Sequence, residues 1–243
     1  MTPRAYVGTS GWHYDHWEGP FYPSGLPPAQ RLPYYAARFS TVEINGTFYR
    51  LPEASTFAAW RNSVPEGFVF AVKASRYLTH MKKLKDAEGA AATFLERAGT
   101  LGGKLGPILF QLPPRWRADP GRLRRFLHGL PRGIRCAFEF RDPSWFDPAV
   151  YRVLEERGCA LCVYEFDRRI SPTLCTAAFG YLRLHGPAGA YRGRYGERGL
   201  EPWAALARRW LSEGRDVYCY FDNDEAGYAV QDASTLRALL GQG

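Results

Sequence analysis

Four residues of types that carry catalysis lie near the ends of strand-like segments of this sequence: Glu43, Lys73, Glu139 and His185. These side chains can transfer protons, and two carboxylates whose environments push their pKa values apart can act as acid and base. We predict the four as catalytic residues. Glu43 and Glu139 form the expected acid–base pair, with either one as the acid.

A second set of polar and aromatic residues lies near the same strand ends or in the loops that follow them. Arginine side chains can clamp an anionic group through forked hydrogen bonds, and flat rings beside carboxylates suit a sugar or a nucleobase. We therefore predict that this set binds the ligand. Its members are Trp12, Asn45, Tyr49, His80, Gln111, Arg141, Trp145, Arg183, Tyr191, Arg192, Arg194, Asp222 and Asn223.

Strand-like and helix-like segments alternate along the 243 residues, and these elements must position the site. The predicted strands are Ala5–Gly11, Thr41–Tyr49, Phe68–Ser75, Pro107–Leu112, Arg135–Arg141, Cys159–Glu165, Tyr181–Gly186 and Asp216–Asn223. The predicted helices are Pro28–Phe39, Ala54–Asn62, Ala87–Leu101, Pro120–His128, Pro148–Arg157, Pro202–Glu213 and Ala233–Leu240. Such alternation favours parallel strands with crossover helices. Eight strands indicate a single α/β domain over residues 1–243, a (β/α)8 TIM-type barrel, with an open doubly wound sheet as the alternative.

The alternation of side chains within each predicted strand favours the barrel. In residues 136–141, apolar side chains occupy one face, and Glu139 and Arg141 lie on the other. The polar face is charged only near the C-terminal end of each strand, where barrels place their active sites. A sheet covered by helices on both faces would bury both alike. By the same reasoning Ser10 and Glu165 point inward.

Charges inside a barrel must pair with one another or bind a ligand, because burying them alone costs several kcal/mol each. Glu43 with Lys73, and Glu139 with Arg141 or Arg183, would form a network that satisfies itself. Branched apolar residues are sufficient to fill a barrel core. So many charges at one end therefore favour a ligand site.

No close-spaced metal-binding motif occurs in the sequence. Cys159 and Cys162 spell C-x-x-C, but residues three apart in a strand point to opposite faces, so we expect no zinc there. A divalent metal cofactor remains an alternative at the strand ends, since barrel ligands need not be close in sequence. Its ligands would be Glu43, Glu139, His185 and Asp222.

The net charge of +8 suits an anionic partner. A glycine-rich loop with Arg192 and Arg194 follows the seventh predicted strand, where barrels often hold phosphate. The expected partner is a small anionic or sugar-like ligand, with nucleic acid as the alternative. We expect no membrane partner, because no apolar run approaches the ~20 residues of a membrane span. The absence of a signal-like N-terminus and the odd number of cysteines predict a cytoplasmic protein.

Several motifs, in order along nearly the whole chain, resemble those of the YecE-like family, defined by domain of unknown function 72. They include VGTSGW at Val7–Trp12, VEINGTFYRLP at Val42–Pro52, GPILFQLPP at Gly106–Pro114, FEFRDPSW at Phe138–Trp145, LRLHG at Leu182–Gly186 and YFDND at Tyr220–Asp224. The resemblance implies a TIM-type barrel with a shared site at the strand ends, and it implies no reaction. The motif residues it carries over are Glu43, Asn45, Lys73, His80, Gln111, Glu139, Arg141, Trp145, Arg183, His185 and Asn223. Asp222 departs from the family pattern, which often has Asn there.

Together these features predict a hydrolase or lyase that acts on a phosphate-bearing or sugar-like ligand at the C-terminal mouth of the barrel. The alternative is a nucleic-acid-binding protein or nuclease that uses the basic and aromatic loops around the same mouth. Arg76, Lys82, Lys83 and Lys85 lie in one of these loops, around His80.

Overall fold

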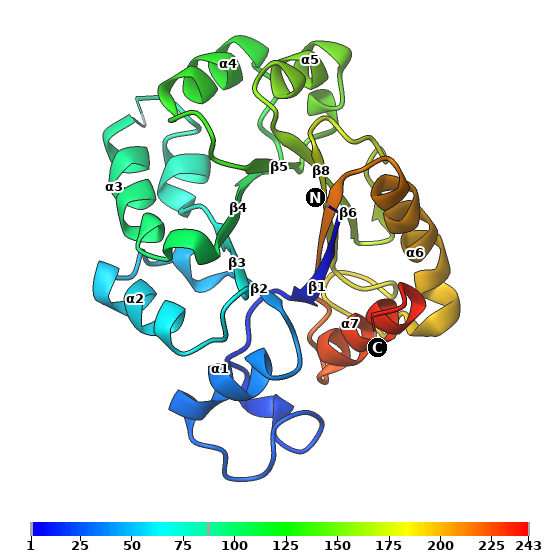
Figure 1. Cartoon of the computed structure of the whole chain (residues 1–243). Coiled ribbons are helices and arrows are strands. Elements are labelled where there is room, and N and C mark those ends of the chain that lie inside the picture. The colour runs from blue at the N-terminus through cyan, green and yellow to red at the C-terminus, as the bar shows by residue number, and fades with distance from the viewer. Residues whose placement is uncertain (1, 87, 243) are drawn as a thin grey trace.

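The computed structural model describes residues 2–86 and 88–242, and its parallel strands form a nearly closed barrel ringed by helices (Figure 1). The strands are β1 (Ala5–Thr9), β2 (Thr41–Ile44), β3 (Val69–Lys73), β4 (Leu105–Leu112), β5 (Cys136–Phe140), β6 (Ala160–Phe166), β8 (Phe179–Leu184) and β9 (Asp216–Phe221), with the short antiparallel β7 (Arg169–Ile170) beside β6. The order β1-β9-β8-β6-β5-β4-β3-β2 confirms the predicted TIM-type barrel.

The barrel closes between β1 and β2, where the Gly11 amide donates to the Glu43 carbonyl at 2.8 Å. Gly8 permits this approach: a Cβ there would lie 2.3 Å from the carbonyl oxygen of Thr41 and 2.9 Å from the hydroxyl of Tyr35. Closure at this seam sets Glu43 beside Ser10, at the C-terminal end of the barrel.

The surrounding helices follow the prediction except between β6 and β8 and at the starts of the last two helices. They are α1 (Pro28–Ala36), α2 (Ala54–Asn62), α3 (Glu88–Gly99), α4 (Pro120–Gly129), α5 (Pro148–Glu156), α6 (Gly196–Ser212) and α7 (Tyr228–Leu239). The predicted start of the third helix, Ala87, lies outside the described residues. Between β6 and β8 the chain forms the β7 hairpin and an extended segment in place of a crossover helix.

The last two helices begin earlier than predicted. Pro202, predicted to open α6, lies inside it. The helix starts at Gly196 because a carboxylate of α7 caps it: Asp232 accepts hydrogen bonds from the amides of Tyr195 at 2.9 Å and Gly196 at 3.1 Å. This cap is distant in the sequence, so local turn signals do not reveal it.

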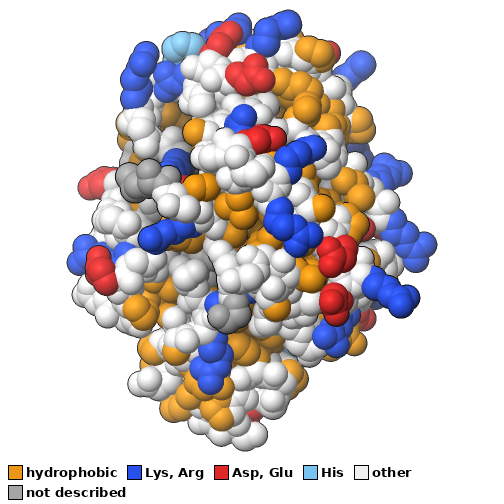
Figure 2. All heavy atoms as spheres, turned by 45° about the vertical axis from the view of Figure 1, so that its right-hand side comes forward, with side chains coloured by type: hydrophobic (Ala, Val, Ile, Leu, Met, Phe, Trp, Pro, Cys, Tyr) orange, Lys and Arg blue, Asp and Glu red, His pale blue; other side chains and the backbone are white. Residues whose placement is uncertain are grey.

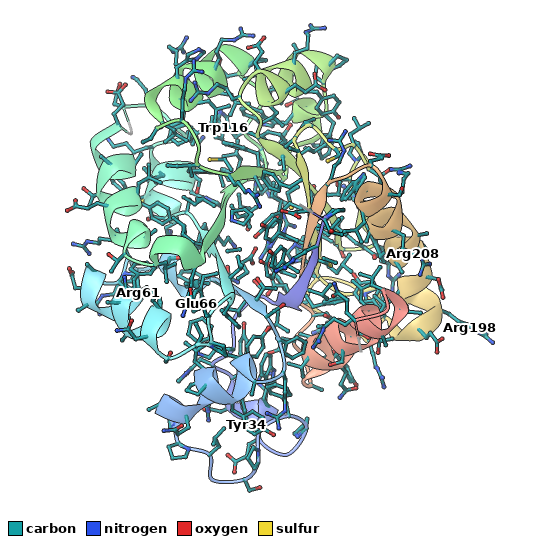
Figure 3. The ribbon with its side chains drawn as sticks, in the orientation of Figure 1. Tyr34, Arg61, Glu66, Trp116, Arg198 and Arg208 are labelled. Atoms are coloured by element: carbon teal, nitrogen blue, oxygen red, sulfur yellow. The ribbon has the colours of Figure 1, made fainter. Side chains whose placement is uncertain are left out.

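Side chains fill the barrel interior (Figure 3). The outer face of each strand is apolar and packs against the helices, as the alternation predicts. The inner face at the N-terminal end carries a tyrosine layer of Tyr6, Tyr181, Tyr218 and Tyr220 with small neighbours such as Ala71. The rings of Tyr6 and Tyr218 stack with centroids 4.8 Å apart. No helix in the described chain is both long and apolar enough to cross a bilayer.

Candidate functional site

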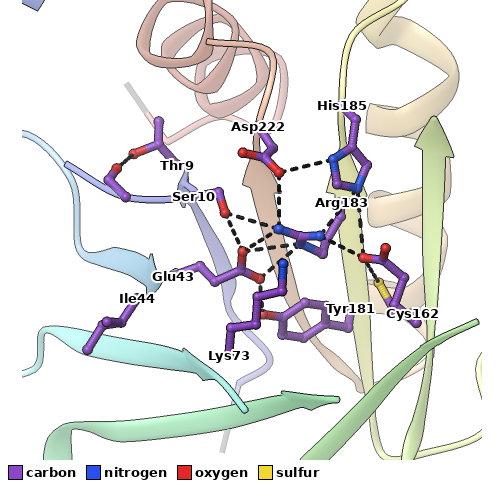
Figure 4. Close-up of polar contacts among 12 residues, drawn as sticks. Thr9, Ser10, Glu43, Ile44, Lys73, Cys162, Tyr181, Arg183, His185 and Asp222 are labelled. Atoms are coloured by element: carbon purple, nitrogen blue, oxygen red, sulfur yellow. Dashed lines mark hydrogen bonds and ion pairs between the residues drawn. The ribbon is translucent and has the colours of Figure 1, made fainter. Parts of the chain in front are cut away.

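Arg183, fully buried on β8, lies at the centre of a charged cluster at the C-terminal ends of the strands (Figure 4). Its guanidinium contacts three carboxylates, from β2, β5 and the residue after β9. The distances are 2.8 Å to Glu43, 2.7 Å to Glu139 and 3.2 Å to Asp222. Strand alternation brings these groups together, since each is the inward residue nearest its strand end.

Further donors complete the coordination of the carboxylates. The hydroxyls of Ser10 and Tyr181 donate to Glu43, the latter at 2.7 Å. Arg141 donates through Nε to Glu139. The charged cluster therefore consists of Ser10, Glu43, Glu139, Arg141, Arg183, His185 and Asp222.

His185 bridges the arginines and Asp222. Its Nε2 lies 3.1 Å from Nη2 of Arg141 and 3.3 Å from Nη1 of Arg183, both donors. Since guanidinium nitrogens cannot accept, Nε2 is the acceptor, and Nδ1 carries the proton toward Asp222 at 3.1 Å. His185 thus holds its neighbours in place through both ring nitrogens.

Arginine charges favour the ionised forms of two of the carboxylates, Glu139 and Asp222. Burial alone would raise the pKa of Glu139, but Arg141 and Arg183 outweigh it and hold the pKa well below its ordinary value. Burial also opposes ionisation of Asp222, yet the hydrogen bond from His185 and the charge of Arg183 lower its pKa. Neither carboxyl has the raised pKa that a general acid near neutral pH needs.

Lys73 ends β3 and extends toward the cluster (Figure 4). Among the described residues, no side chain or carbonyl forms a hydrogen bond or ion pair with its ammonium group, which lies 4.5 Å from the ring centroid of Phe48. Burial and the charge of Arg183 lower the pKa of Lys73 from 10.5 to about 8. About a tenth of this lysine is therefore a neutral amine at pH 7, and about half at pH 8.

A mouth pocket of about 680 Å³ opens beside the cluster, over the ends of β4, β5 and β6. Arg141 lines it, 8% exposed, with its guanidinium 4.0 Å from the ring centroid of Phe166. In the described part of the chain, no acceptor contacts the Nη1 group of Arg141. Gln111, Phe166, Arg169 and Tyr191 also line this mouth pocket. It combines a cation, an amide and aromatic rings.

Comparison with known proteins assigns the chain to a family. The model of "Protein of unknown function DUF72" matches residues 6–243. The chain belongs to the DUF72 family. A curated relative, the UPF0759 protein YunF of Bacillus subtilis (strain 168), is 27% identical over 97% of this chain and 94% of its own.

Solved DUF72 structures have the same fold. A DUF72 family protein from Thermotoga maritima MSB8 is 27% identical, with a TM-score of 0.89 over 98% of this chain and 99% of that one. Another, from Enterococcus faecalis V583, is 20% identical, with a TM-score of 0.81 over 99% of both chains. The family predicted from the motifs is confirmed.

In this DUF72 protein the predicted catalytic residues Glu43, Glu139 and His185 meet in the charged cluster, and Lys73 faces it. The predicted ion pairing is right for Glu139, which contacts both Arg141 and Arg183. It is wrong for Glu43, which pairs with Arg183 rather than Lys73.

Several predicted binding residues lie around the mouth but outside the cluster. Trp12 and Asn45 line a separate, largely apolar pocket of about 640 Å³ between α1 and α2. His80 packs its ring edge-on against Phe48, and Tyr49 is exposed. Arg194 lies 3.8 Å from Asp232 on the surface, and Arg192 is exposed in the same loop.

Three predicted binding residues are unavailable to a ligand in this arrangement. Trp145 is fully buried, stacked on Phe140, and its N–H donates to the carbonyl of Trp116 at 2.6 Å. Asn223 is buried and donates to Gly193 and Asp232, which fixes the loop after β8. Arg183 directs its donor groups to protein acceptors within the cluster.

The residues predicted as metal ligands are not arranged to hold a metal ion. Arg183 stands among Glu43, Glu139 and Asp222, so a cation would have to displace a guanidinium. Across residues 2–86 and 88–242, no group of three or more His, Cys, Asp or Glu is placed to hold a metal. Lys73 and Arg141 likewise oppose a second cation here.

Glu165 does not point inward as predicted. It lies on the outer face of β6 near Tyr195 and Trp203, and burial raises its pKa. The inward residues at the C-terminal end of β6 are Tyr164 and Phe166, which contact Arg141 and were missed. The alternation of Leu161 and Val163 with Cys162 and Tyr164 is the signal that identifies them.

Proposed function

We propose that this DUF72 protein is a lyase acting on a small anionic ligand, sugar-like or phosphate-bearing, with the amine of Lys73 as the reacting group. The observation that carries the proposal is the position of Lys73. It is the one cation facing the cluster that has no carboxylate partner among the described residues. A buried amine that is partly neutral near pH 7–8 can attack a carbonyl carbon or remove a proton beside it.

The carboxylates favour lyase over hydrolase chemistry. Glycoside hydrolysis needs one carboxyl group that donates a proton and another that attacks or activates water. Glu43 and Glu139 are instead both bound to Arg183. Condensation of Lys73 with an aldehyde or ketone needs neither carboxylate as an acid. The neutral amine adds to the carbonyl carbon to form a carbinolamine, whose hydroxide leaves and takes up a proton from solvent to become water. The resulting iminium withdraws electrons from the adjacent bond.

The mouth pocket supports an anionic ligand. Arg141 is fixed by Glu139 and His185 on one side and by aromatic rings on the other, so its remaining donors are held toward the pocket. Such a preorganised guanidinium binds phosphate or carboxylate strongly. Tyr191, with its ring 5.7 Å from that of His185, offers a flat surface for a sugar.

Reductive trapping tests the proposal. The protein is incubated with pyruvate or dihydroxyacetone phosphate and cyanoborohydride, and modified lysines are mapped by mass spectrometry. Lys73 should be labelled in preference to the half-buried Lys82 and the exposed Lys83 and Lys85, with yield rising toward pH 8. Lys73→Met should abolish this adduct. Lys104→Met is the matched control, because Lys104 donates to backbone carbonyls away from the mouth.

Two outcomes would separate the parts of the proposal. Arg141→Met should raise the ligand concentration for half-maximal labelling about tenfold, the equivalent of ~1.4 kcal/mol, while Lys73 remains reactive. Labelling confined to the surface lysines, with Lys73 unmodified across the carbonyl compounds, would refute the role of Lys73.

Nucleic-acid binding is the second candidate, favoured by exposed rings beside basic residues. Tyr49 and Tyr77 are 74% and 42% exposed, and the Lys82 ammonium lies 5.8 Å from the Tyr77 ring centroid. Lys and Arg side chains are dispersed over the face in Figure 2 rather than gathered in one patch. Binding of single strands should weaken with salt, with a log–log slope of about −0.7 per phosphate contact. A flat salt response would exclude this candidate.

A further inference from the structure

Cys136 and Cys159 lie side by side at the end of the barrel opposite the charged cluster. Cys136 begins β5, and Cys159 directly precedes β6. Ala137 and Ala160 are partners in the parallel ladder, so the two cysteines occupy the preceding pair of positions. Neighbouring strands lie about 4.7–4.9 Å apart. This spacing falls within the roughly 4.4–6.8 Å between Cα atoms that a disulfide spans.

Both side chains point to the same side of the sheet and meet. They belong to the outer apolar core, unlike Ala137 and Ala160, which face inward. The neighbouring thiols influence each other, which lowers the pKa of Cys159 and raises that of Cys136. The Cys159 thiol also donates to the carbonyl of Arg157 at 3.7 Å. Cys159 is therefore the thiol of the pair that ionises more readily.

A pocket of about 300 Å³ adjoins the pair, although each cysteine is only 3% exposed. Both cysteines line it, together with His128, Arg132 and Arg157. The positive charge of Arg157 favours the thiolate form of Cys159. Thiolates beside cations at accessible sites are the ones that react with oxidants.

The other cysteines lack this combination. Cys162 is buried inside the barrel 3.9 Å from Glu139, and burial raises its pKa. Burial also raises the pKa of Cys219, with no charged group offsetting it. Cys175 donates to the carbonyl of Phe179 at 3.3 Å, and no second thiol contacts it among the described residues.

We propose that Cys136 and Cys159 form a peroxide-sensitive dithiol that closes reversibly to a disulfide. The Cys159 thiolate attacks one peroxide oxygen, and the O–O bond breaks. This gives a sulfenic acid and an alkoxide or hydroxide that takes up a proton, so the sulfur is oxidised and the peroxide reduced. Cys136 then attacks the Cys159 sulfur. The S–S bond forms, the S–O bond breaks, and hydroxide leaves as water with the proton of Cys136.

Mass spectrometry of the full chain after hydrogen peroxide treatment tests the proposal. In the wild type, two thiols should become resistant to alkylation under denaturing conditions, a peptide cross-link should join Cys136 to Cys159, and dithiothreitol should restore both. Cys136→Ser should stop at the sulfenic acid, so that Cys159 reacts with dimedone. Cys159→Ser should lose at least about tenfold in peroxide reactivity of the pair.

Cys175→Ser is the matched control and should behave like the wild type, since Cys175 lies away from this pocket. Serine conserves size at these small buried positions, and circular dichroism checks that each variant is folded. A cross-link that involves Cys162, Cys175 or Cys219, or equal dimedone labelling in Cys159→Ser and Cys136→Ser, would overturn the proposal. The outcome is independent of the chemistry proposed for Lys73 at the other end of the barrel.

Discussion

The two halves of the barrel interior are filled in opposite ways. Toward the N-terminal ends of the strands lies the tyrosine layer, whose large rings stack and are complemented by small residues such as Ala71 and Ala137. Toward the C-terminal ends lies the charged cluster, in which Arg183 contacts three carboxylates. The rings of the tyrosine layer bury much apolar surface and so stabilise the fold directly.

The charged half gains much less from burial. Desolvating an ion pair costs several kcal/mol per ion, and apolar residues of similar volume often give an equally stable or more stable protein. Stability alone therefore accounts for the tyrosine layer but not for the charged cluster. We therefore infer that the charged half of the interior has a function besides stabilising the fold. Variants in each half can test this inference.

Arg183→Met should produce the largest effect. It leaves Glu43, Glu139 and Asp222 buried without their shared cation, and breaking a buried pair in this way costs about 3–5 kcal/mol. Urea unfolding near neutral pH measures the loss in the free energy of unfolding. Arg208→Met, which removes an arginine 49% exposed on α6, should change it by less than about 0.5 kcal/mol.

The pH dependence of this loss sharpens the test. Glu139 and Asp222 have folded-state pKa values below their ordinary range, so they stabilise the wild type above pH ~4 and lose that contribution as pH falls. The difference between Arg183→Met and the wild type should therefore shrink as the pH is lowered toward ~3. A pH-independent difference would point to lost packing as the cause.

Lys73→Met should stabilise the protein, in contrast to Arg183→Met. The folded-state pKa of Lys73, about 8, lies below its ordinary 10.5, so the protonated lysine opposes folding at neutral pH. Methionine fills a similar space without charge. It should raise the free energy of unfolding by about 1–3 kcal/mol at pH 7. The gain should decline between pH 8 and 10.5, as the wild-type lysine loses its proton. No gain at pH 7 would mean that the ammonium is well solvated.

Alternation along the strands predicted most of the charged half. A strand allows its side chains only two directions, so Glu43, Glu139 and Arg183 could be assigned to the interior from sequence. The prediction that Glu165 points inward is wrong because it rests on the charge of this side chain and not on the alternation of side chains along its strand.

The rest depends on contacts that no local pattern encodes. Trp145 ends the 3₁₀ helix Pro143–Trp145, which is too short to show a periodic pattern. Its N–H donates to the carbonyl of Trp116, a contact that sequence does not reveal. The start of α6 depends on Asp232 of α7. Sequence also could not show that Glu43 would pair with Arg183 and not with Lys73, because both cations are predicted near the same strand end.

Two residues of the tyrosine layer compare a hydrogen bond to the charged cluster with a neutral one. Tyr181→Phe removes a donor from the Glu43 carboxylate, a hydrogen bond to a charged group worth about 1.5–3 kcal/mol. Tyr220→Phe removes a neutral bond to Thr41, whose hydroxyl also donates to Val69, and should cost about 0.5–1.5 kcal/mol. Urea unfolding of both variants measures the difference. A larger loss for Tyr220→Phe would contradict the expectation that the hydrogen bond to the Glu43 carboxylate contributes more to stability than the neutral bond to Thr41.

Arg194→Ala should have the smallest effect on stability. Its guanidinium lies 3.8 Å from Asp232 and the side chain is 52% exposed, and ion pairs at such positions contribute about 0–1 kcal/mol. Asp232 keeps its hydrogen bonds to the amides of Tyr195 and Gly196 when Arg194 is lost. The free energy of unfolding should therefore change by less than about 0.5 kcal/mol. A loss approaching that of Arg183→Met would show that charge at the rim supports the fold as much as charge at the centre, and the contrast between the two halves of the barrel would fail.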